Sequence, residues 1–149
     1  MRKTALLASL VLINLTPAQV GAATQIPAAC KKYEKLALEV GFKRSDLSEL
    51  FRISYRESHC TPTSIGKNRN SLGIITSQDW GMTQVNDVSW VTYLRDKHII
   101  KSKEDLLNPR TNLRAALALV KYSIGKGLPK WHQWRTANPS GSAGAAANK

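Results

Sequence analysis

Apolar residues recur at spacings of three and four in several stretches of this chain, as expected for one buried face of an α-helix. We predict helices over residues 28–40, from an N-cap at Ser45 to before Pro62, from an N-cap at Asp87 to about Lys97, and from Asn108-Pro109 to about Ile124. A short helix is expected after Ser102, and one more helical turn should contain Trp131 and Trp134. The pattern predicts a mostly helical protein.

Residues 61–78 break the helical pattern. They are rich in Thr, Ser, Asn and Gly, with scattered apolar residues at Ile65, Leu72, Ile74 and Ile75. Loops with short strands have this composition. We therefore predict an α+β fold, mostly helical, with a small β insert between the second and third helices.

The two ends of the chain differ from its middle. Arg2 and Lys3 precede an apolar run of about a dozen residues, followed by small residues at 21–23, a pattern typical of a secretory signal peptide. The run is shorter than the ~20 residues that span a bilayer. We predict a signal peptide over 1–23, one domain over 24–136 and a disordered tail over 137–149. The mature chain would be exported without a transmembrane segment; the alternative is an N-terminal anchor that is not cleaved.

The charge is strongly positive. The chain has 22 Lys and Arg against 10 Asp and Glu, and removal of Arg2 and Lys3 leaves 20 against 10, a net charge of +10. A basic exported protein is expected to meet a polyanionic partner, such as a wall polymer, anionic lipid or extracellular DNA. The aromatic residues do not interleave with the basic ones as base-stacking platforms would. We therefore predict no specific nucleic-acid binding.

The two cysteines, Cys30 and Cys60, both follow the signal segment. An even number of cysteines in an oxidising compartment predicts a disulfide, and the alternatives are two free thiols or an intermolecular pair. The bond would close a loop of about 30 residues and stabilise the fold by roughly 3–4 kcal/mol. The three histidines lack the spacing of a zinc site, so we expect no metal and no cofactor.

Two carboxylates are candidates for catalysis. Glu57 continues the apolar stripe of Leu50 and Ile53, where partial desolvation would favour the protonated form that a general acid needs. Asp79 follows a polar, turn-rich stretch and should be more solvated. Two carboxyl groups in unlike environments are typical of acid-assisted glycoside cleavage. The alternative for Glu57 is an ordinary solvated helix residue.

Polar residues close to Asp79 are candidates for substrate binding. Gln84 and Asn86 alternate with apolar residues in Met82-Thr83-Gln84-Val85-Asn86. Their amides could bind sugar hydroxyl and N-acetyl groups in a cleft; the alternative is loop packing.

Several motifs together resemble the lysozyme-like transglycosylases. They are Arg56-Glu57-Ser58, Asn68-Arg69-Asn70 followed by Gly73, Asp79-Trp80-Gly81-Met82-Thr83-Gln84-Val85-Asn86, and Leu107-Asn108-Pro109 with Asn112. The match covers about residues 45–134 and is similar to the small exported transglycosylases that accompany secretion and conjugation machines. Two features depart from that family's usual pattern: Ala116 and Leu119 replace a Gly and an aromatic residue, and no Tyr-Asn pair closes the sequence.

The resemblance implies a lysozyme-like fold with a cleft between the helices and the β insert. It implies Glu57 as the catalytic acid, Gln84, Asn86 and Ser58 as substrate-binding residues, and Asp79 at the place of the second carboxylate of c-type lysozymes. It also implies a monomer that acts on peptidoglycan glycan strands and has a secretion or conjugation apparatus as partner. We expect a lytic transglycosylase; the alternatives are a hydrolytic lysozyme and a non-catalytic basic wall-binding module.

Overall fold

The computed structural model describes residues 25–135, so the predicted signal peptide and C-terminal tail lie outside the described residues. Four α-helices and three strands form the fold in the order α1 (Glu34–Val40), α2 (Leu47–Ser58), β1 (Ile65–Arg69), β2 (Ile75–Trp80), β3 (Val85–Asn86), α3 (Asp87–Asp96) and α4 (Pro109–Gly125). Short 3-10 helices complete it at η1 (Ala28–Tyr33), η2 (Arg44–Asp46), η3 (Lys103–Leu107) and η4 (His132–Trp134). This is the predicted α+β architecture, mostly helical with a small β insert.

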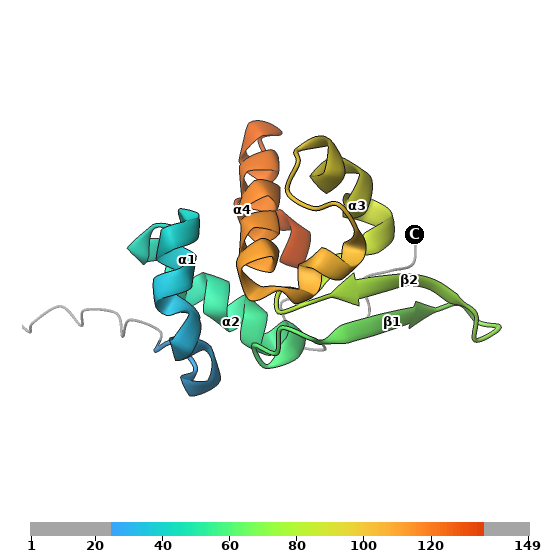
Figure 1. The fold of residues 1–149 in the computed structure, drawn as a ribbon, viewed down its shortest axis with the longest axis horizontal. Coiled ribbons are helices and arrows are strands. Elements are labelled where there is room, and N and C mark those ends of the chain that lie inside the picture. Colours follow the sequence, from blue (N-terminus) through green and yellow to red (C-terminus); the bar gives the residue numbers. More distant parts are fainter. Residues whose placement is uncertain (1–24, 136–149) are drawn as a thin grey trace, which may run out of the picture.

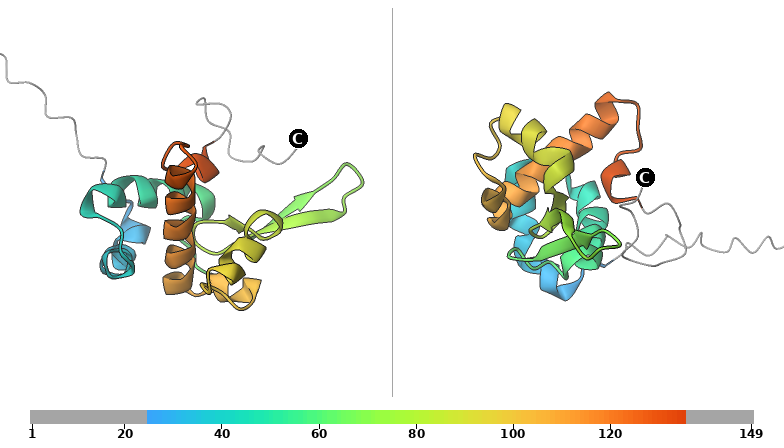
Figure 2. Two further views of the ribbon diagram at one scale, coloured as in Figure 1. Left: turned by 90° about the horizontal axis from the view of Figure 1, so that it is seen from above. Right: turned by 90° about the vertical axis from the view of Figure 1, so that its right-hand side faces the viewer.

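Helix α4 is the centre of the fold. It packs against α1, η3 and η4, while α3 contacts strands β2 and β3 (Figure 1). Strands β1 and β2 form a long hairpin that projects away from the helices in the views of Figures 1 and 2. The body of the protein is therefore helical, and the hairpin meets it only at its base.

The hydrophobic core lies between α2, α4 and the segment after β2. The fully buried side chains include Leu50, Phe51 and Ile53 of α2, Leu113 and Leu119 of α4, Leu94, Leu106, Met82 and Val85. Burial of each such side chain contributes roughly 1.5–3 kcal/mol. This core fixes the C-terminal half of α2, where Glu57 lies, relative to the loop after β2.

Helix boundaries agree with the sequence pattern except in the first helix and at two N-caps. Residues 28–40 do not form one α-helix, because η1 covers Ala28–Tyr33 and α1 begins at Glu34. Ser45 is not the N-cap of the second helix: it lies inside η2, and α2 begins at Leu47 after Asp46. Asp87 is not the N-cap of α3, because Asn86 takes that place and its Oδ1 accepts the Ser89 N–H at 3.0 Å. Asp87 instead accepts the backbone N–H of Gln78 at 2.8 Å. The error at α3 is a choice between two adjacent capping residues. Helix α2 instead continues directly from η2, and its N-cap residue Asp46 makes no side-chain capping hydrogen bond.

The sheet is antiparallel with the order β1-β2-β3. Ile65 pairs with Trp80 at the base of the hairpin, and Asp79 faces Gly66 on one side and Asn86 on the other. The central strand therefore carries Asp79 into the middle of the sheet, next to the helical body.

A disulfide joins Cys30 of η1 to Cys60, which lies two residues beyond α2, with the two Cα atoms 5.4 Å apart. The predicted pairing is confirmed. Both residues are buried, and Cys60 adopts a left-handed backbone conformation (φ 58°). The bond ties the N-terminal helical segment to the end of the helix that carries Glu57.

We expect the double substitution Cys30→Ser with Cys60→Ser to lower the free energy of unfolding by roughly 3–4 kcal/mol, because the unfolded chain regains the freedom of a 30-residue loop. Urea denaturation with and without reductant measures this. Reductant should destabilise the parent protein and leave the double variant unchanged. Quantitative thiol labelling of the denatured, non-reduced parent protein would contradict the disulfide.

Candidate active site

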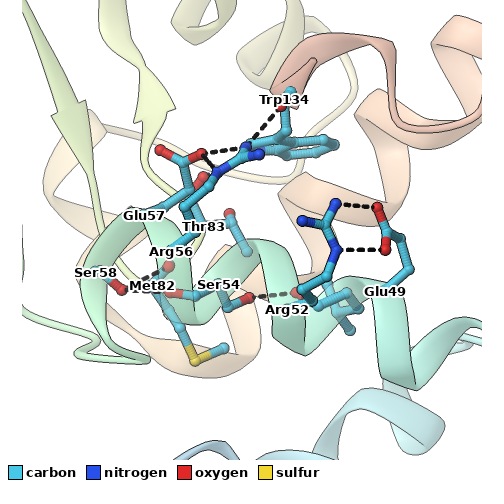
Figure 3. Close-up of polar contacts among 10 residues, drawn as sticks. Glu49, Arg52, Ser54, Arg56, Glu57, Ser58, Met82, Thr83 and Trp134 are labelled. Atoms are coloured by element: carbon cyan, nitrogen blue, oxygen red, sulfur yellow. Dashed lines mark hydrogen bonds and ion pairs between the residues drawn. The ribbon is translucent and has the colours of Figure 1, made fainter. Parts of the chain in front are cut away.

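Glu57 lies in the last turn of α2 and is half-buried, with 28% of its side chain exposed. The Arg56 guanidinium donates two hydrogen bonds to Glu57 Oε1, from Nε at 3.0 Å and from Nη2 at 2.6 Å. Arg56 Nη2 also donates to the carbonyl oxygen of Trp134 at 2.6 Å. Figure 3 shows both side chains reaching from α2 toward Trp134. One oxygen of the carboxylate is thus held by an arginine that is itself anchored to η4.

Trp134 of η4 joins Arg56 to the loop after β2. Its side chain is 8% exposed, and its indole N–H donates to the Thr83 carbonyl oxygen at 2.7 Å. The same residue therefore touches Arg56 through its backbone and the loop after β2 through its ring. Arg56 and Trp134 were not predicted as site residues, because their contact joins positions 78 residues apart.

Ser58 connects α2 to that loop. Its hydroxyl lies 2.7 Å from the Met82 carbonyl oxygen and 3.2 Å from that of Ser54, and it accepts the Thr61 N–H at 3.1 Å. Ser58 is buried and these bonds are internal. In this structure the serine fixes the loop beside Glu57, and a role in binding substrate stays a prediction.

The side chain of Asn112 of α4 binds the loop of residues 81–84. The Asn112 side chain accepts from the Thr83 N–H (2.9 Å) and hydroxyl (2.8 Å) and donates to the carbonyl oxygens of Trp80 and Leu106, both at 3.0 Å. Gly81 has φ +75°, and a Cβ there would collide with the Leu106 carbonyl oxygen and the Asn112 amide. Only glycine fits this close approach, so residues of two separate sequence motifs, Gly81 and Asn112, are in direct contact in the fold.

Asp79 lies at the centre of a polar cluster on the sheet. Its Oδ2 accepts from Asn68 Nδ2 and its Oδ1 from Asn86 Nδ2, both at 2.8 Å. The same two amides also bind the Ser77 hydroxyl. An ionised carboxylate is an acceptor-only group, so two amide donors match it in geometry. The structure thus brings together Asp79 and Asn86 of the predicted site and adds Asn68.

Gln84 lies next to this cluster but its amide turns toward the backbone. Its Nε2 donates to the carbonyl oxygens of Gly81 (2.8 Å) and Ser64 (3.3 Å), and its backbone has φ 51°. A Cβ on Gly66 would meet Gln84 Oε1 at 2.8 Å and approach Asp79 Oδ2 at 3.7 Å. Gly66 therefore leaves space for the side chains of Gln84 and Asp79. In the structure Gln84 binds the backbone of its own loop, and its role as a substrate ligand stays a prediction.

The predicted site residues form two groups. Glu57 is held with Arg56 and Trp134, whereas Asp79 is held with Asn68 and Asn86. The loop of residues 81–84 lies between the groups in the chain. Ser58 binds this loop from α2, and Gln84, a residue of the loop, donates to the carbonyl oxygens of Gly81 and Ser64. A separate hollow between α1 and α4, lined by Val40, Leu117 and Lys121, contains none of the predicted site residues.

Comparison with known proteins identifies the family of this chain. Residues 41–144 match the family described as the transglycosylase SLT domain, and the chain belongs to that family. Members of the family are lytic transglycosylases with a peptidoglycan substrate, and their domain is of the lysozyme-like superfamily.

A relative from Escherichia coli O157:H7, named "Peptidoglycan-binding-like protein", is 40% identical over 87 residues, which are 58% of this chain and 52% of the relative. The chain thus matches about half the length of that curated relative. No solved structure matches the chain. Within residues 25–135 the structure has no helix with the length and apolar character needed to cross a membrane.

Proposed function

We propose that this chain is a peptidoglycan lytic transglycosylase that cleaves the β-1,4 bond between N-acetylmuramic acid and N-acetylglucosamine. The observation that carries the proposal is Glu57, a partly exposed carboxylate at the end of α2 in an SLT domain, beside the loop that Ser58 anchors. Digestion of purified sacculi tests it, with mass spectrometry of the fragments.

In this mechanism Glu57 works first as an acid and then as a base. Its proton passes to the glycosidic oxygen as the bond from that oxygen to the anomeric carbon breaks. The Glu57 carboxylate then takes the proton of the muramoyl 6-hydroxyl, whose oxygen forms the new bond to the anomeric carbon. Glu57 ends protonated, no water is consumed, and the product has a 1,6-anhydro end.

The resting contact with Arg56 bears on the first step. Protonation of the glycosidic oxygen needs a proton on a Glu57 oxygen that can reach the glycan. Both hydrogen bonds from Arg56 reach Oε1, which leaves Oε2 as the oxygen that can face the glycan.

A hydrolytic lysozyme on the same fold is the second candidate, and the Asp79 cluster is the observation that favours it. A carboxylate held by Asn68 and Asn86 is placed on the sheet where it could stabilise an oxocarbenium-like transition state or attack it. In the transglycosylase, Asp79 would instead orient the β insert or stabilise developing positive charge.

We expect Asp79→Asn to retain measurable lytic activity and the 1,6-anhydro product, because Glu57 alone serves both proton transfers. Asn68→Ala is the matched control, since it removes a hydrogen bond of the same cluster and leaves the carboxylate in place. Rates of release of soluble fragments from sacculi compare the parent protein with Asp79→Asn, Asn68→Ala and Glu57→Gln. A loss with Asp79→Asn as severe as that of Glu57→Gln, with a mild effect of Asn68→Ala, would favour the hydrolase.

The name of the relative keeps a non-catalytic wall-binding module as a third candidate. As part of the same proposal, residues 1–23 direct export and the protein acts outside the cytoplasm. It would act on glycan strands as a monomer and have a secretion or conjugation apparatus as partner. Gln84 and Asn86 would bind sugar amides once substrate replaces their internal contacts.

A further inference from the structure

The end of the β1–β2 hairpin exposes a cluster of aliphatic side chains. Leu72 is 80% exposed, Ile74 58% and Ile75 41%, all within four positions. We call these three residues the hairpin tip. Single exposed apolar residues are ordinary on protein surfaces, as Val88 is on α3, but three together at the end of a projecting hairpin are not. Figures 1 and 2 show this end of the hairpin far from the helical body.

Hydrogen bonds hold the hairpin tip in its exposed form. Asn70 Oδ1 accepts the N–H groups of Leu72 and Ile74, both at 3.0 Å, and the Asn70 N–H donates to the Ile74 carbonyl oxygen at 3.0 Å. Arg69 Nη1 donates to the Gly73 carbonyl oxygen at 2.6 Å. The loop is therefore ordered before it meets a partner, so less conformational entropy is lost on binding.

The charge around the hairpin tip has one sign. Residues 61–78 contain Lys67 and Arg69 and no Asp or Glu. Both cations lie on the exposed side of β1, and Arg69 pairs across the hairpin with Ile75. The end of the hairpin thus has three exposed aliphatic side chains, and the adjoining strand β1 carries two exposed positive charges.

We propose that the hairpin tip docks on a phospholipid bilayer with anionic headgroups. Aliphatic side chains would enter the boundary of the acyl chains while Lys67 and Arg69 meet the headgroup phosphates. Charge complementarity favours this occupant, since the chain has a formal net charge of +12 and the hairpin has no acidic residue before Asp79. A protein partner fits less well, because protein hot spots are enriched in Trp and Tyr, which the tip lacks, and Leu is under-represented in them.

A dye placed at the hairpin tip tests this directly in the full chain. An environment-sensitive dye on the Leu72→Cys variant should shift its emission to the blue with phosphatidylglycerol vesicles and not with phosphatidylcholine vesicles. The dye on the Val88→Cys variant is the matched control, since Val88 is 72% exposed and lies on α3. The emission of the dye at Val88 should not shift. A membrane contact made only by the N-terminal segment would leave the dye at Leu72 unshifted as well, so a shift at Leu72 alone reports insertion of the hairpin tip.

Lys67→Gln added to the labelled Leu72→Cys variant should raise the lipid concentration for half-maximal shift about fivefold, because a cation near an anionic surface contributes that much. Lys67 is chosen because the bonds that order the tip use Arg69 instead. Equal shifts at Leu72 and Val88, or equal shifts with both lipids, would overturn the proposal. Absence of a shift with any vesicle would also overturn it and point to a protein partner.

Discussion

Glu57→Gln is expected to abolish wall lysis while the protein stays folded. Glutamine keeps the shape of the side chain and can still meet Arg56, but it cannot give a proton to the glycosidic oxygen or take one from the 6-hydroxyl. Loss of general acid catalysis alone lowers the rate by about 10²–10⁴-fold. Zymograms and the clearing of sacculus suspensions measure the loss, and circular dichroism checks the fold.

The chain offers a matched control for this substitution on the same helix. Glu49 lies two turns before Glu57 and is also bound by an arginine, with Arg52 Nε at 2.7 Å and Nη2 at 2.6 Å from its oxygens. Those hydrogen bonds lower the pKa of Glu49, but its side chain is 38% exposed and the pair adds little stability. Glu49→Gln should therefore keep full activity. If Glu57→Gln cleared the wall substrate normally, that result would contradict the catalytic role of Glu57 and favour the wall-binding module.

Asn112→Ala is expected to cause the largest loss of stability, roughly 3–5 kcal/mol of the free energy of unfolding. The alanine leaves the Thr83 N–H and the carbonyl oxygens of Trp80 and Leu106 without the partner they have in the core. The loop of residues 81–84 would loosen, and Ser58 and Trp134 would lose a fixed partner beside Glu57. Activity should fall together with stability.

Asn108→Ala on the same helix separates this effect from helix capping. Asn108 caps α4 by accepting the N–H groups of Arg110 and Thr111 at 3.0 and 3.2 Å. Loss of an exposed cap costs about 1 kcal/mol. Urea denaturation of both variants gives the comparison. A loss for Asn112→Ala no greater than that for Asn108→Ala would contradict the role assigned to Asn112.

The helices follow from local spacing, which the sequence displays directly. Leu50, Ile53 and Glu57 share one stripe of α2, and Asn108-Pro109 starts α4 as predicted, because such signals need only residues three or four apart. The N-cap of α3 was misplaced by one residue, since Asn86 and Asp87 are both good caps. Asn86 caps the helix and Asp87 binds the Gln78 N–H because of the pairing of the strands in the sheet. Local spacing in the sequence does not show that pairing.

The site was predictable as a set of residues rather than as an arrangement. Motif spacing selected Glu57 and Asp79, but nothing local indicates that Arg56 binds both Glu57 and the carbonyl oxygen of Trp134. The internal bonds of Ser58 were also not predicted, whereas those of Gln84 agree with the loop-packing alternative for its segment. Polar residues near a site can bind either the protein backbone or the substrate. Only the contacts in the three-dimensional structure distinguish these two roles.

Digestion of purified sacculi by the parent protein and by Glu57→Gln, with mass spectrometry of the released fragments, distinguishes a lytic transglycosylase from a lysozyme and from a binding module. The parent protein should release disaccharide-containing fragments with 1,6-anhydro muramoyl ends, each lighter by one water molecule than the hydrolytic product. Glu57→Gln should release none. Fragments with reducing ends only would contradict the transglycosylase mechanism, and intact sacculi after treatment with the parent protein would contradict the enzyme itself.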